Sequence, residues 1–131
     1  MEAGALLKFA KTFAVIGLSE NPEKYSYKIY QRLILCGYTT YGISPFLKEL
    51  DGSKVYSSLK EVPAPIDVAV FVVSPKNGYQ YLEECKKLGI KYLWMQPGTY
   101  DEAMLQALEQ SGLSYYLDCI LRKTDSPEKA A

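Results

Sequence analysis

The sequence predicts an α/β domain in which helices cover both faces of a parallel sheet of about five strands. Short β-branched apolar runs recur along the chain, and glycine or proline turns bound them. The segments between these runs carry apolar residues at helical spacing. Connections of this length make neighbouring strands parallel, which gives a three-layer domain. The 131 residues suit one domain, expected over residues 1–122, with 123–131 as a charged, disordered tail.

The most informative stretch is residues 11–37, KTFAVIGLSENPEKYSYKIYQRLILCG. Its first part, Thr12–Leu18, predicts a strand that is buried on both faces. Its last part, Ser26–Cys36, predicts an amphipathic helix. The polar turn between them begins at Gly17. A strand that leads through such a turn into a helix directs the helix N–H groups toward the turn, and this geometry favours a nucleotide phosphate.

The flanking segments of the N-terminal half are shorter. Residues 2–10 carry three large apolar side chains among small and charged residues, which predicts a short helix. Tyr38–Ser44 is rich in β-branched and aromatic residues and predicts the second strand. Residues 46–54 are expected to form a loop around the turn Asp51-Gly52. The Ser-x-x-Glu spacing over Ser58–Glu61 predicts a single helical turn.

The C-terminal half repeats the alternation of strand and helix. Ile66–Val73 (IDVAVFVV) is the most hydrophobic run in the chain and predicts a central parallel strand. Two helices are expected, over Asn77–Leu88 and from a capping box at Thr99–Glu102 onward. Strands at Ile90–Met95 and Leu113–Leu117 follow these helical patterns in turn.

The composition excludes several function classes. Fifteen basic and fifteen acidic residues cancel, which argues against a broad surface for nucleic acid. No apolar run approaches the roughly 18 residues of a membrane span, and no signal-peptide pattern is present. The three cysteines are widely spaced and histidine is absent, so neither a zinc site nor a disulfide framework is indicated. We therefore expect a cytoplasmic protein that contacts neither nucleic acid nor membrane.

The sequence also lacks a catalytic constellation. Without histidine, a Ser-His-Asp triad, a phosphohistidine and histidine metal ligation are excluded. The acidic residues near the predicted strand ends show no spacing typical of a general acid–base pair. The sequence thus predicts a binding module that is not an enzyme.

Ligands of open parallel sheets bind beyond the carboxyl ends of the strands, where the strand order reverses. Five predicted loops would meet there, with the sequences GLSENPEKYS, SPFLK, VSPKNG, QPGTYDE and LDCILRK. Compared with the dinucleotide fingerprint G-x-G-x-x-G, the first loop keeps Gly17 but has Ser19 and Pro22 at the other two glycine positions. The end of the second strand offers no acid for a ribose hydroxyl, and its first charge is Lys48. These departures argue against NAD and suit a nucleotide with an additional ribose phosphate.

The segments GLSENPEKYSY, ISP, VYSSLKEVPAPIDVAVFVV, WMQPGTYDE and DCI occur in an order that resembles the small stand-alone CoA-binding proteins of the YccU type. That family is similar to the CoA-binding domain of succinyl-CoA synthetase. The resemblance extends from Leu6 to Arg122. It implies a Rossmann-like fold with coenzyme A or an acyl-CoA as the ligand. The phosphohistidine of the synthetase lies outside the similar region and has no equivalent in this chain.

The resemblance also implies which residues bind the cofactor. They lie in four loops: Gly17, Leu18, Ser19, Asn21, Pro22, Lys24 and Ser26; Ser44, Pro45 and Lys48; Val73 and Ser74; Gln96, Pro97 and Gly98. Two departures from the family pattern stand out. Lys24 occupies a position where arginine is common, so the charge is kept but the bidentate fork is lost. Ser44-Pro45 replaces a common Asn-Pro.

Several of these residues have alternative roles. Ser26 is expected to cap its helix, which would orient the N–H groups that contact phosphate. Lys48 is either the cation for the 3′-phosphate of CoA or a solvated lysine. Cys119 is either an inert buried thiol or a partner for the CoA thiol in a mixed disulfide.

Two other functions stay open at the level of the sequence. One is an NAD(P)-binding oxidoreductase or redox-sensing domain, and the other is a structural subunit that has lost ligand binding. Both a homodimer and an unknown protein partner are compatible with the sequence.

Overall fold

The computed structural model describes residues 1–124 of the chain, which form one seven-stranded sheet in the order β3-β4-β2-β1-β5-β6-β7. The strands are β1 (Thr12–Ile16), β2 (Thr39–Ile43), β3 (Glu49–Leu50), β4 (Ser53–Tyr56), β5 (Val68–Phe71), β6 (Tyr92–Met95) and β7 (Ser114–Leu117). Neighbours from β4 through β7 pair in parallel, and β3 pairs antiparallel with β4. The predicted α/β class with a parallel sheet is confirmed.

The strand count exceeds the prediction because residues 49–56 form a hairpin, of which residues 49–54 lie in the predicted loop. Val55-Tyr56, expected as a brief extended piece, is the second half of β4. The turn of the hairpin is the predicted one, with φ of 50° at Asp51 and 82° at Gly52. Two successive residues with positive φ match the twist of a tight hairpin. The short flanking strands carry Glu49 and Lys54, both exposed, and therefore lack the apolar alternation by which strands are predicted.

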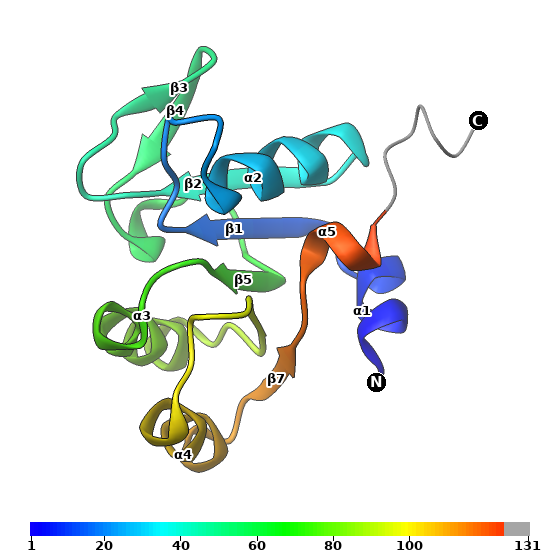
Figure 1. Cartoon of the computed structure of the whole chain (residues 1–131), viewed down its shortest axis with the longest axis vertical. Helices are drawn as coiled ribbons and strands as arrows, with labels where there is room; N and C mark the ends of the chain where they lie inside the picture. Colours follow the sequence, from blue (N-terminus) through cyan, green and yellow to red (C-terminus); the bar gives the residue numbers. More distant parts are fainter. Residues whose placement is uncertain (125–131) are drawn as a thin grey trace.

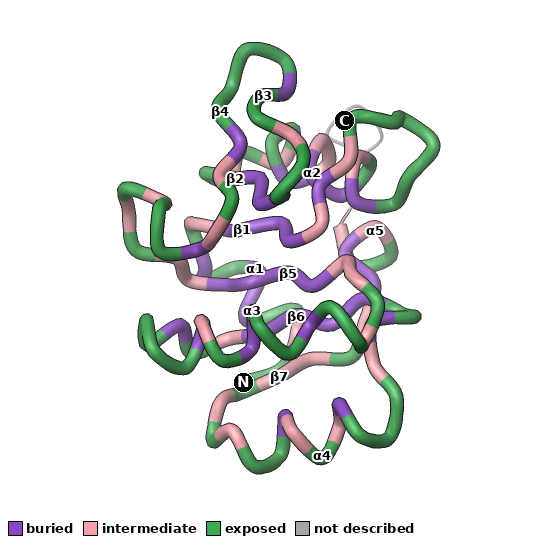
Figure 2. The backbone as a smooth tube through the Cα atoms, turned by 90° about the vertical axis from the view of Figure 1, so that its left-hand side faces the viewer, coloured by how far each residue is buried: buried purple, intermediate pink, exposed green. Residues whose placement is uncertain are grey.

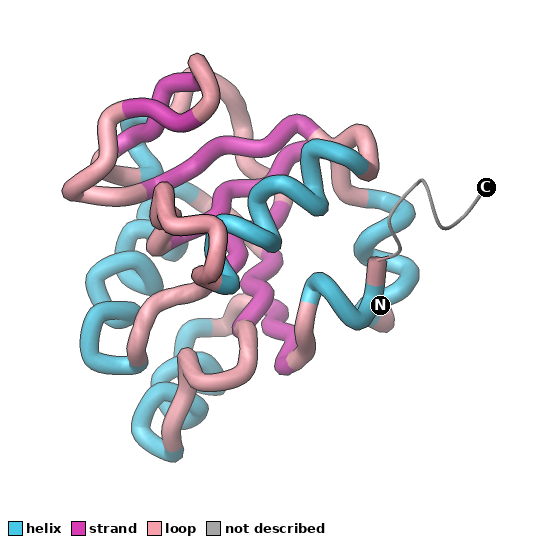
Figure 3. The backbone as a smooth tube through the Cα atoms, turned by 45° about the horizontal axis from the view of Figure 1, so that its top comes forward, coloured by secondary structure: helices cyan, strands magenta, loops and turns pink. Residues whose placement is uncertain are grey.

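Helices cover both faces of the sheet, as Figures 1 and 3 show. They are α1 (Ala3–Phe9), α2 (Tyr25–Leu35), α3 (Pro75–Leu88), α4 (Glu102–Ser111) and α5 (Ile120–Lys123), with a 3-10 turn η1 (Leu59–Glu61). The helices α1, α2 and α5 share one buried cluster, and α3, α4 and η1 share the other. The three-layer arrangement is therefore the predicted one. Among residues 1–124, no helix has the length and apolar character needed to cross a bilayer.

The central strand β1 supplies side chains to both cores. Phe13 and Val15 pack in the cluster beneath α2, whereas Ala14 and Ile16 pack in the cluster beneath α3. All four are inaccessible to solvent, and Figure 2 shows the buried strands stacked between exposed helix surfaces. Burial on both faces explains why this strand reads as a continuous apolar run.

The helix α4 begins two residues later than a capping box at Thr99 would place it. Asp101 is the N-cap, and its Oδ1 accepts a hydrogen bond of 2.8 Å from the N–H of Met104. Thr99 is buried in the preceding turn, where its hydroxyl donates to the carbonyl of Gln96 at 2.7 Å. The predicted capping box is therefore wrong: the helix begins at the N-cap Asp101, which bonds the Met104 N–H, and the Thr99 hydroxyl is engaged in the preceding turn.

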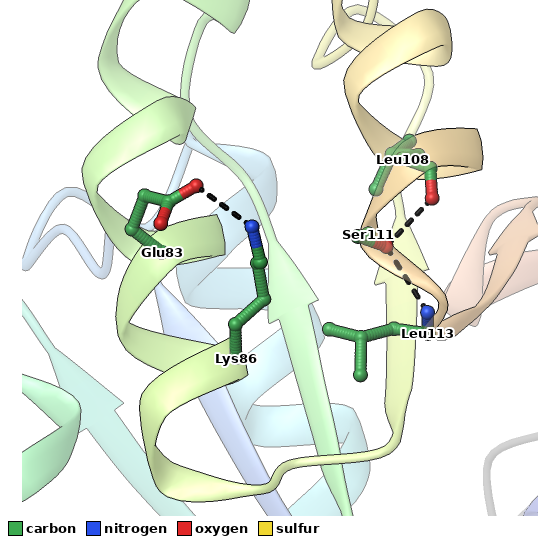
Figure 4. Close-up of polar contacts among 5 residues, drawn as sticks. All are labelled: Glu83, Lys86, Leu108, Ser111 and Leu113. Carbon is green, nitrogen blue, oxygen red and sulfur yellow. Dashed lines mark hydrogen bonds and ion pairs between the residues drawn. The ribbon is translucent and has the colours of Figure 1, made fainter.

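The far end of α4 is closed by Ser111, as Figure 4 shows. The Ser111 hydroxyl donates to the carbonyl of Leu108 at 2.6 Å and accepts from the N–H of Leu113 at 3.1 Å. The same view shows the exposed ion pair between Glu83 and Lys86 on α3, with 3.2 Å between Oε1 and Nζ. An exposed pair of this kind contributes little to stability.

The C-terminal helix α5 extends past the predicted domain boundary at Arg122. Arg32 of α2 holds it, because its Nη1 donates to the carbonyls of Leu121 and Thr124. Lys123 and Thr124 are therefore part of the packed structure. The remainder of the predicted tail, residues 125–131, lies outside the described residues.

Asp67 joins the start of β1 to β5. Its Oδ2 accepts hydrogen bonds from the backbone N–H of Lys11 at 2.8 Å and of Thr12 at 3.1 Å. The carboxylate thus satisfies two donors that precede the first pairs of the central ladder, Phe13 with Val68 onward.

We expect Asp67→Ala to lower the free energy of unfolding by roughly 1–3 kcal/mol, because two backbone donors lose their acceptor. Asp67→Asn keeps one side-chain oxygen and should lose less. Chemical denaturation followed by far-UV circular dichroism measures both. A midpoint for Asp67→Ala equal to that of the parent would show that water replaces the carboxylate without cost.

Candidate functional site

The strand order reverses between β1 and β5. The strands β2 and β4 lie on one side of β1, and β5, β6 and β7 lie on the other. The carboxyl ends of β1 and β5 are therefore neighbours, and α2 and α3 begin beyond them on opposite faces of the sheet. A crevice at such a reversal is where open parallel sheets bind ligands.

Gly17 ends β1 in very close contact with β5. Its φ is +95°, and a Cβ at this position would lie 2.6 Å from the Val72 carbonyl oxygen and 2.6 Å from Val73 Cγ1. The N–H groups of Gly17 and Leu18 both donate to the carbonyl of Ile43, at 2.9 and 3.1 Å. The packing of strand ends thus explains the glycine without reference to a ligand.

The loop after Gly17 is closed by its own hydrogen bonds. The N–H of Ser19 donates to Ser26 Oγ at 3.1 Å, and the N–H of Asn21 donates to Ser19 Oγ at 3.1 Å. Asn21 in turn accepts from the N–H groups of Glu23 and Lys24. The N–H groups of Ser19 and Asn21 are therefore engaged within the loop. The first-turn N–H groups of α2, which helix geometry leaves without intrahelical partners, are the donors that a phosphate could meet.

The predicted N-cap role of Ser26 is wrong. Lys24 occupies the N-cap position without a side-chain cap bond, and Ser26 is the second residue of α2. Ser26 is 4% exposed, and its hydroxyl fixes the loop at Ser19. The apolar periodicity predicted the helix. The hydrogen bond from the Ser19 N–H to the hydroxyl of Ser26, inside the first turn, has no recognisable sequence pattern.

A first cavity of about 500 Å³ opens beside the ends of β1, β2 and β5. It brings together six of the predicted residues, namely Gly17, Leu18, Ser19, Ser44, Pro45 and Val73. The other six lining residues were not named as cofactor-binding, although the first four lie in loops predicted to meet at this edge: Glu20, Phe46, Leu47, Asn77, Gln80 and Tyr81. Three of these residues are one helical turn apart on α3, so the i, i+3, i+4 spacing of positions 77, 80 and 81 was a usable signal.

A second cavity of about 310 Å³ lies on the α2 and α5 side of the same edge. Its lining residues are Tyr25, Val72, Gln96, Pro97, Cys119, Leu121 and Arg122. Of these the sequence had predicted Gln96 and Pro97 as site residues. The two cavities flank the backbone at Val72-Val73, because Val72 packs toward one core and Val73 toward the other.

The remaining predicted residues line neither of these two cavities: Asn21, Pro22, Lys24, Ser26, Lys48, Ser74 and Gly98. Two residues that do line a cavity also hold backbone in place. Ser44 Oγ accepts from the N–H groups of Phe46 and Leu47 at 3.1 and 3.3 Å. Gln96 Oε1 accepts from the N–H of Ile120 at 2.7 Å and so attaches α5 to the end of β6.

The two cavities differ in the charge of their lining residues. The first is lined by the acidic Glu20, and the second is lined by the basic Arg122. Burial, with the nearby Glu84 carboxylate adding to it, raises the pKa of Tyr81 above its ordinary value. Its hydroxyl is therefore neutral at neutral pH and can both donate and accept. The described residues contain no group of three or more His, Cys, Asp and Glu side chains that could hold a metal ion.

Comparison with known proteins identifies the family. A family model described as "CoA binding domain" matches residues 11–125. The uncharacterized protein YneT of Bacillus subtilis is 28% identical over 121 residues, which cover 92% of this chain and 90% of that protein. The alpha subunit of ADP-forming acetate–CoA ligase II from Pyrococcus furiosus is 38% identical over 79 residues, 60% of this chain. That match covers 17% of the ligase subunit.

A solved structure of a conserved hypothetical protein from Pyrococcus furiosus superimposes with a TM-score of 0.81 at 38% identity. The alignment covers 87% of this chain and 99% of that one. The Rossmann-like fold expected from the sequence is thus confirmed, and the family match spans the ends of all the strands that form the site. The chain belongs to the CoA-binding domain family.

Proposed function

We propose that this protein binds coenzyme A or an acyl-CoA and catalyses no reaction on it. The proposal rests on where the cavity residues lie relative to the family match. Every residue that lines either cavity at the carboxyl edge, from Gly17 to Arg122, lies within the segment that matches the CoA-binding domain, residues 11–125. The segment shared with the family is therefore the segment that builds the site.

The two cavities suit the two ends of this ligand. Coenzyme A joins an adenosine 3′-phosphate, through a pyrophosphate, to a pantetheine arm that ends in a thiol. The first cavity lies at the end of β2, the position at which dinucleotide-binding folds read the adenine ribose. The second is walled by Val72, Pro97 and Leu121, apolar side chains that match an aliphatic arm.

The start of α2 lies between the two ends. Ser19 and Glu20, which precede the helix, line the first cavity, and Tyr25, its first residue, lines the second. A pyrophosphate placed over this helix start would meet the N–H groups of its first turn and the positive end of its dipole. Lys24, exposed at the N-cap position, would add a cation there.

The absence of catalysis is part of the proposal. The ligase relative is named for acetate and CoA, but the match covers 17% of that subunit. A segment of that size would carry the binding of CoA without the remainder of the ligase. This chain has no histidine, and its site residues offer hydrogen bonds, apolar contacts and single charges.

Coenzyme A should raise the melting temperature selectively. A ligand at about 100 times its Kd that binds only the native state adds about 2.7 kcal/mol of stability. In a domain of this size that corresponds to roughly 5–15 °C. Thermal-shift measurements with CoA, NADH and ATP test the proposal, and equal or larger stabilisation by NADH would overturn it.

Lys48 should read the 3′-phosphate. It lies two residues beyond the cavity residue Phe46, and its backbone carbonyl accepts from the N–H of Val55 at 2.9 Å, which fixes its place at the base of the hairpin. Its side chain is exposed, so a phosphate contact is screened by salt and worth about 1 kcal/mol at most.

We therefore expect about fivefold tighter binding of CoA than of dephospho-CoA at low salt, and a smaller ratio at high salt. Lys48→Ala should abolish this preference and leave the affinity for dephospho-CoA unchanged. Isothermal titration with both ligands measures it, with Lys76→Ala as the matched control. Discrimination that persists in Lys48→Ala but disappears in the control would assign the phosphate to Lys76.

Cys119 should form a mixed disulfide when the protein is treated with CoA disulfide. It is 7% exposed, and it lines the second cavity, where the thiol end of the ligand would lie. Its thiolate would attack one sulfur of CoA disulfide, so that a Cys119–CoA bond forms and the second CoA leaves as a thiolate.

Intact-mass measurement of the variant Cys36→Ser, and of the same variant with Cys119→Ser, tests this expectation. Cys85 is an internal control, because burial raises the pKa of its thiol to about 12 and keeps it protonated and unreactive. An adduct that survives Cys119→Ser, or none in either variant, would contradict the assignment.

A further inference from the structure

Phe46 is the most exposed large apolar side chain of the described residues. It is 94% exposed, whereas the next, Tyr25, is 66% exposed. The residue is part of the lining of the first cavity, at the end of β2. Of the four aromatic pairs described between residues 1 and 124, none includes Phe46. The cavity thus has beside it an aromatic side chain whose surface is open to water.

The backbone that presents this ring is held in place. Ser44, which is 5% exposed, accepts the N–H groups of Phe46 and Leu47 on its hydroxyl oxygen. Its own N–H donates to the carbonyl of Tyr56 at 2.9 Å and so ties the loop to β4. Phe46 is therefore exposed on a loop whose backbone is held by hydrogen bonds.

We infer that Phe46 stacks on the adenine base of coenzyme A. The inference rests on the proposed function and gives a binding role to Phe46, which the sequence placed in a loop at the site without naming it as a contact. The end of β2 is where an adenosine lies in folds of this class, and a purine offers a flat face of the kind an aromatic ring covers. Stacking would remove both surfaces from water.

The stacking would contribute affinity without hydrogen bonds that distinguish one base from another. A stacked aromatic contact is tolerant of base identity because every base has a π-face. Phe46 would therefore tighten the binding of any ligand that carries the nucleotide end. It would have no effect on a ligand that carries only the pantetheine end, which lies on the other side of the Val72-Val73 backbone.

Isothermal titration of the parent and of Phe46→Ala tests this with three ligands: CoA, adenosine 3′,5′-diphosphate and 4′-phosphopantetheine. We expect Phe46→Ala to weaken the first two by about tenfold or more and to leave the third unchanged. Phe46→Tyr should restore the affinity. The matched control is Phe9→Ala, which removes another exposed ring, 55% exposed, on α1 before the opposite end of β1.

A spectroscopic arm uses Phe46→Trp. The natural tryptophan, Trp94, is fully buried, so the new indole is distinguished by its solvent-exposed emission. CoA and adenosine 3′,5′-diphosphate should quench that emission, and 4′-phosphopantetheine should not.

The results distinguish a failure of the Phe46 stacking from a failure of CoA binding itself. If the parent binds CoA and Phe46→Ala binds it equally well, the stacking is overturned and the proposed function stands. Equal weakening of CoA and 4′-phosphopantetheine would likewise overturn it, because the ring would then not contact the base. If the parent binds none of the three ligands, the proposed function fails, and the stacking fails with it.

Discussion

The contact between Gly17 and the end of β5 sets the geometry on which the site depends. A Cβ at Gly17 would collide with the carbonyl oxygen of Val72, so the two strand ends approach as closely as backbone allows. On the other side, the carbonyl of Ile43 accepts two successive N–H groups from Gly17 and Leu18. The ends of β1, β2 and β5 are thereby fixed to one another before any loop residue is placed.

The rest of the site follows from this junction. The chain leaves Gly17 in a loop that Ser19 and Ser26 close, and this closure determines where α2 begins. On the β5 side, Val72 and Val73 point to opposite faces, so the edge is divided into two cavities. The loop before α2 lines one cavity and the first residue of α2 lines the other, so the start of this helix borders both. The edge thus offers different chemistry at its two ends.

Much of the fold could be predicted because burial leaves a pattern in the residue types. Strands such as Val68–Phe71 are inaccessible on both faces and read as continuous apolar runs. The hairpin at residues 49–56 could not be predicted in this way, since its strands are short and partly exposed. The N-cap of α4 depended on a competition between Asp101 and Thr99 that only the backbone path decides.

The site was less predictable than the fold for a similar reason. The loop residues were found from their place after each strand, but their exposure is a three-dimensional property. Phe46 reads in the sequence as an ordinary apolar residue, and its 94% exposure is visible only in the structure. The second cavity depends on α5, whose position follows from bonds between residues far apart in the chain, such as Gln96 with Ile120.

The way α5 is attached allows the side chains of the second cavity to vary during evolution. The hydrogen bonds from Gln96 and Arg32 that hold this helix end on backbone atoms of residues 120–124, and one more ends on the Thr124 hydroxyl. Leu121 and Arg122, whose side chains line the cavity, take part in these bonds at most through their backbone. Their side chains can be replaced without removing the anchors. One scaffold can in this way diversify the lining of the second cavity while the first cavity is inherited intact.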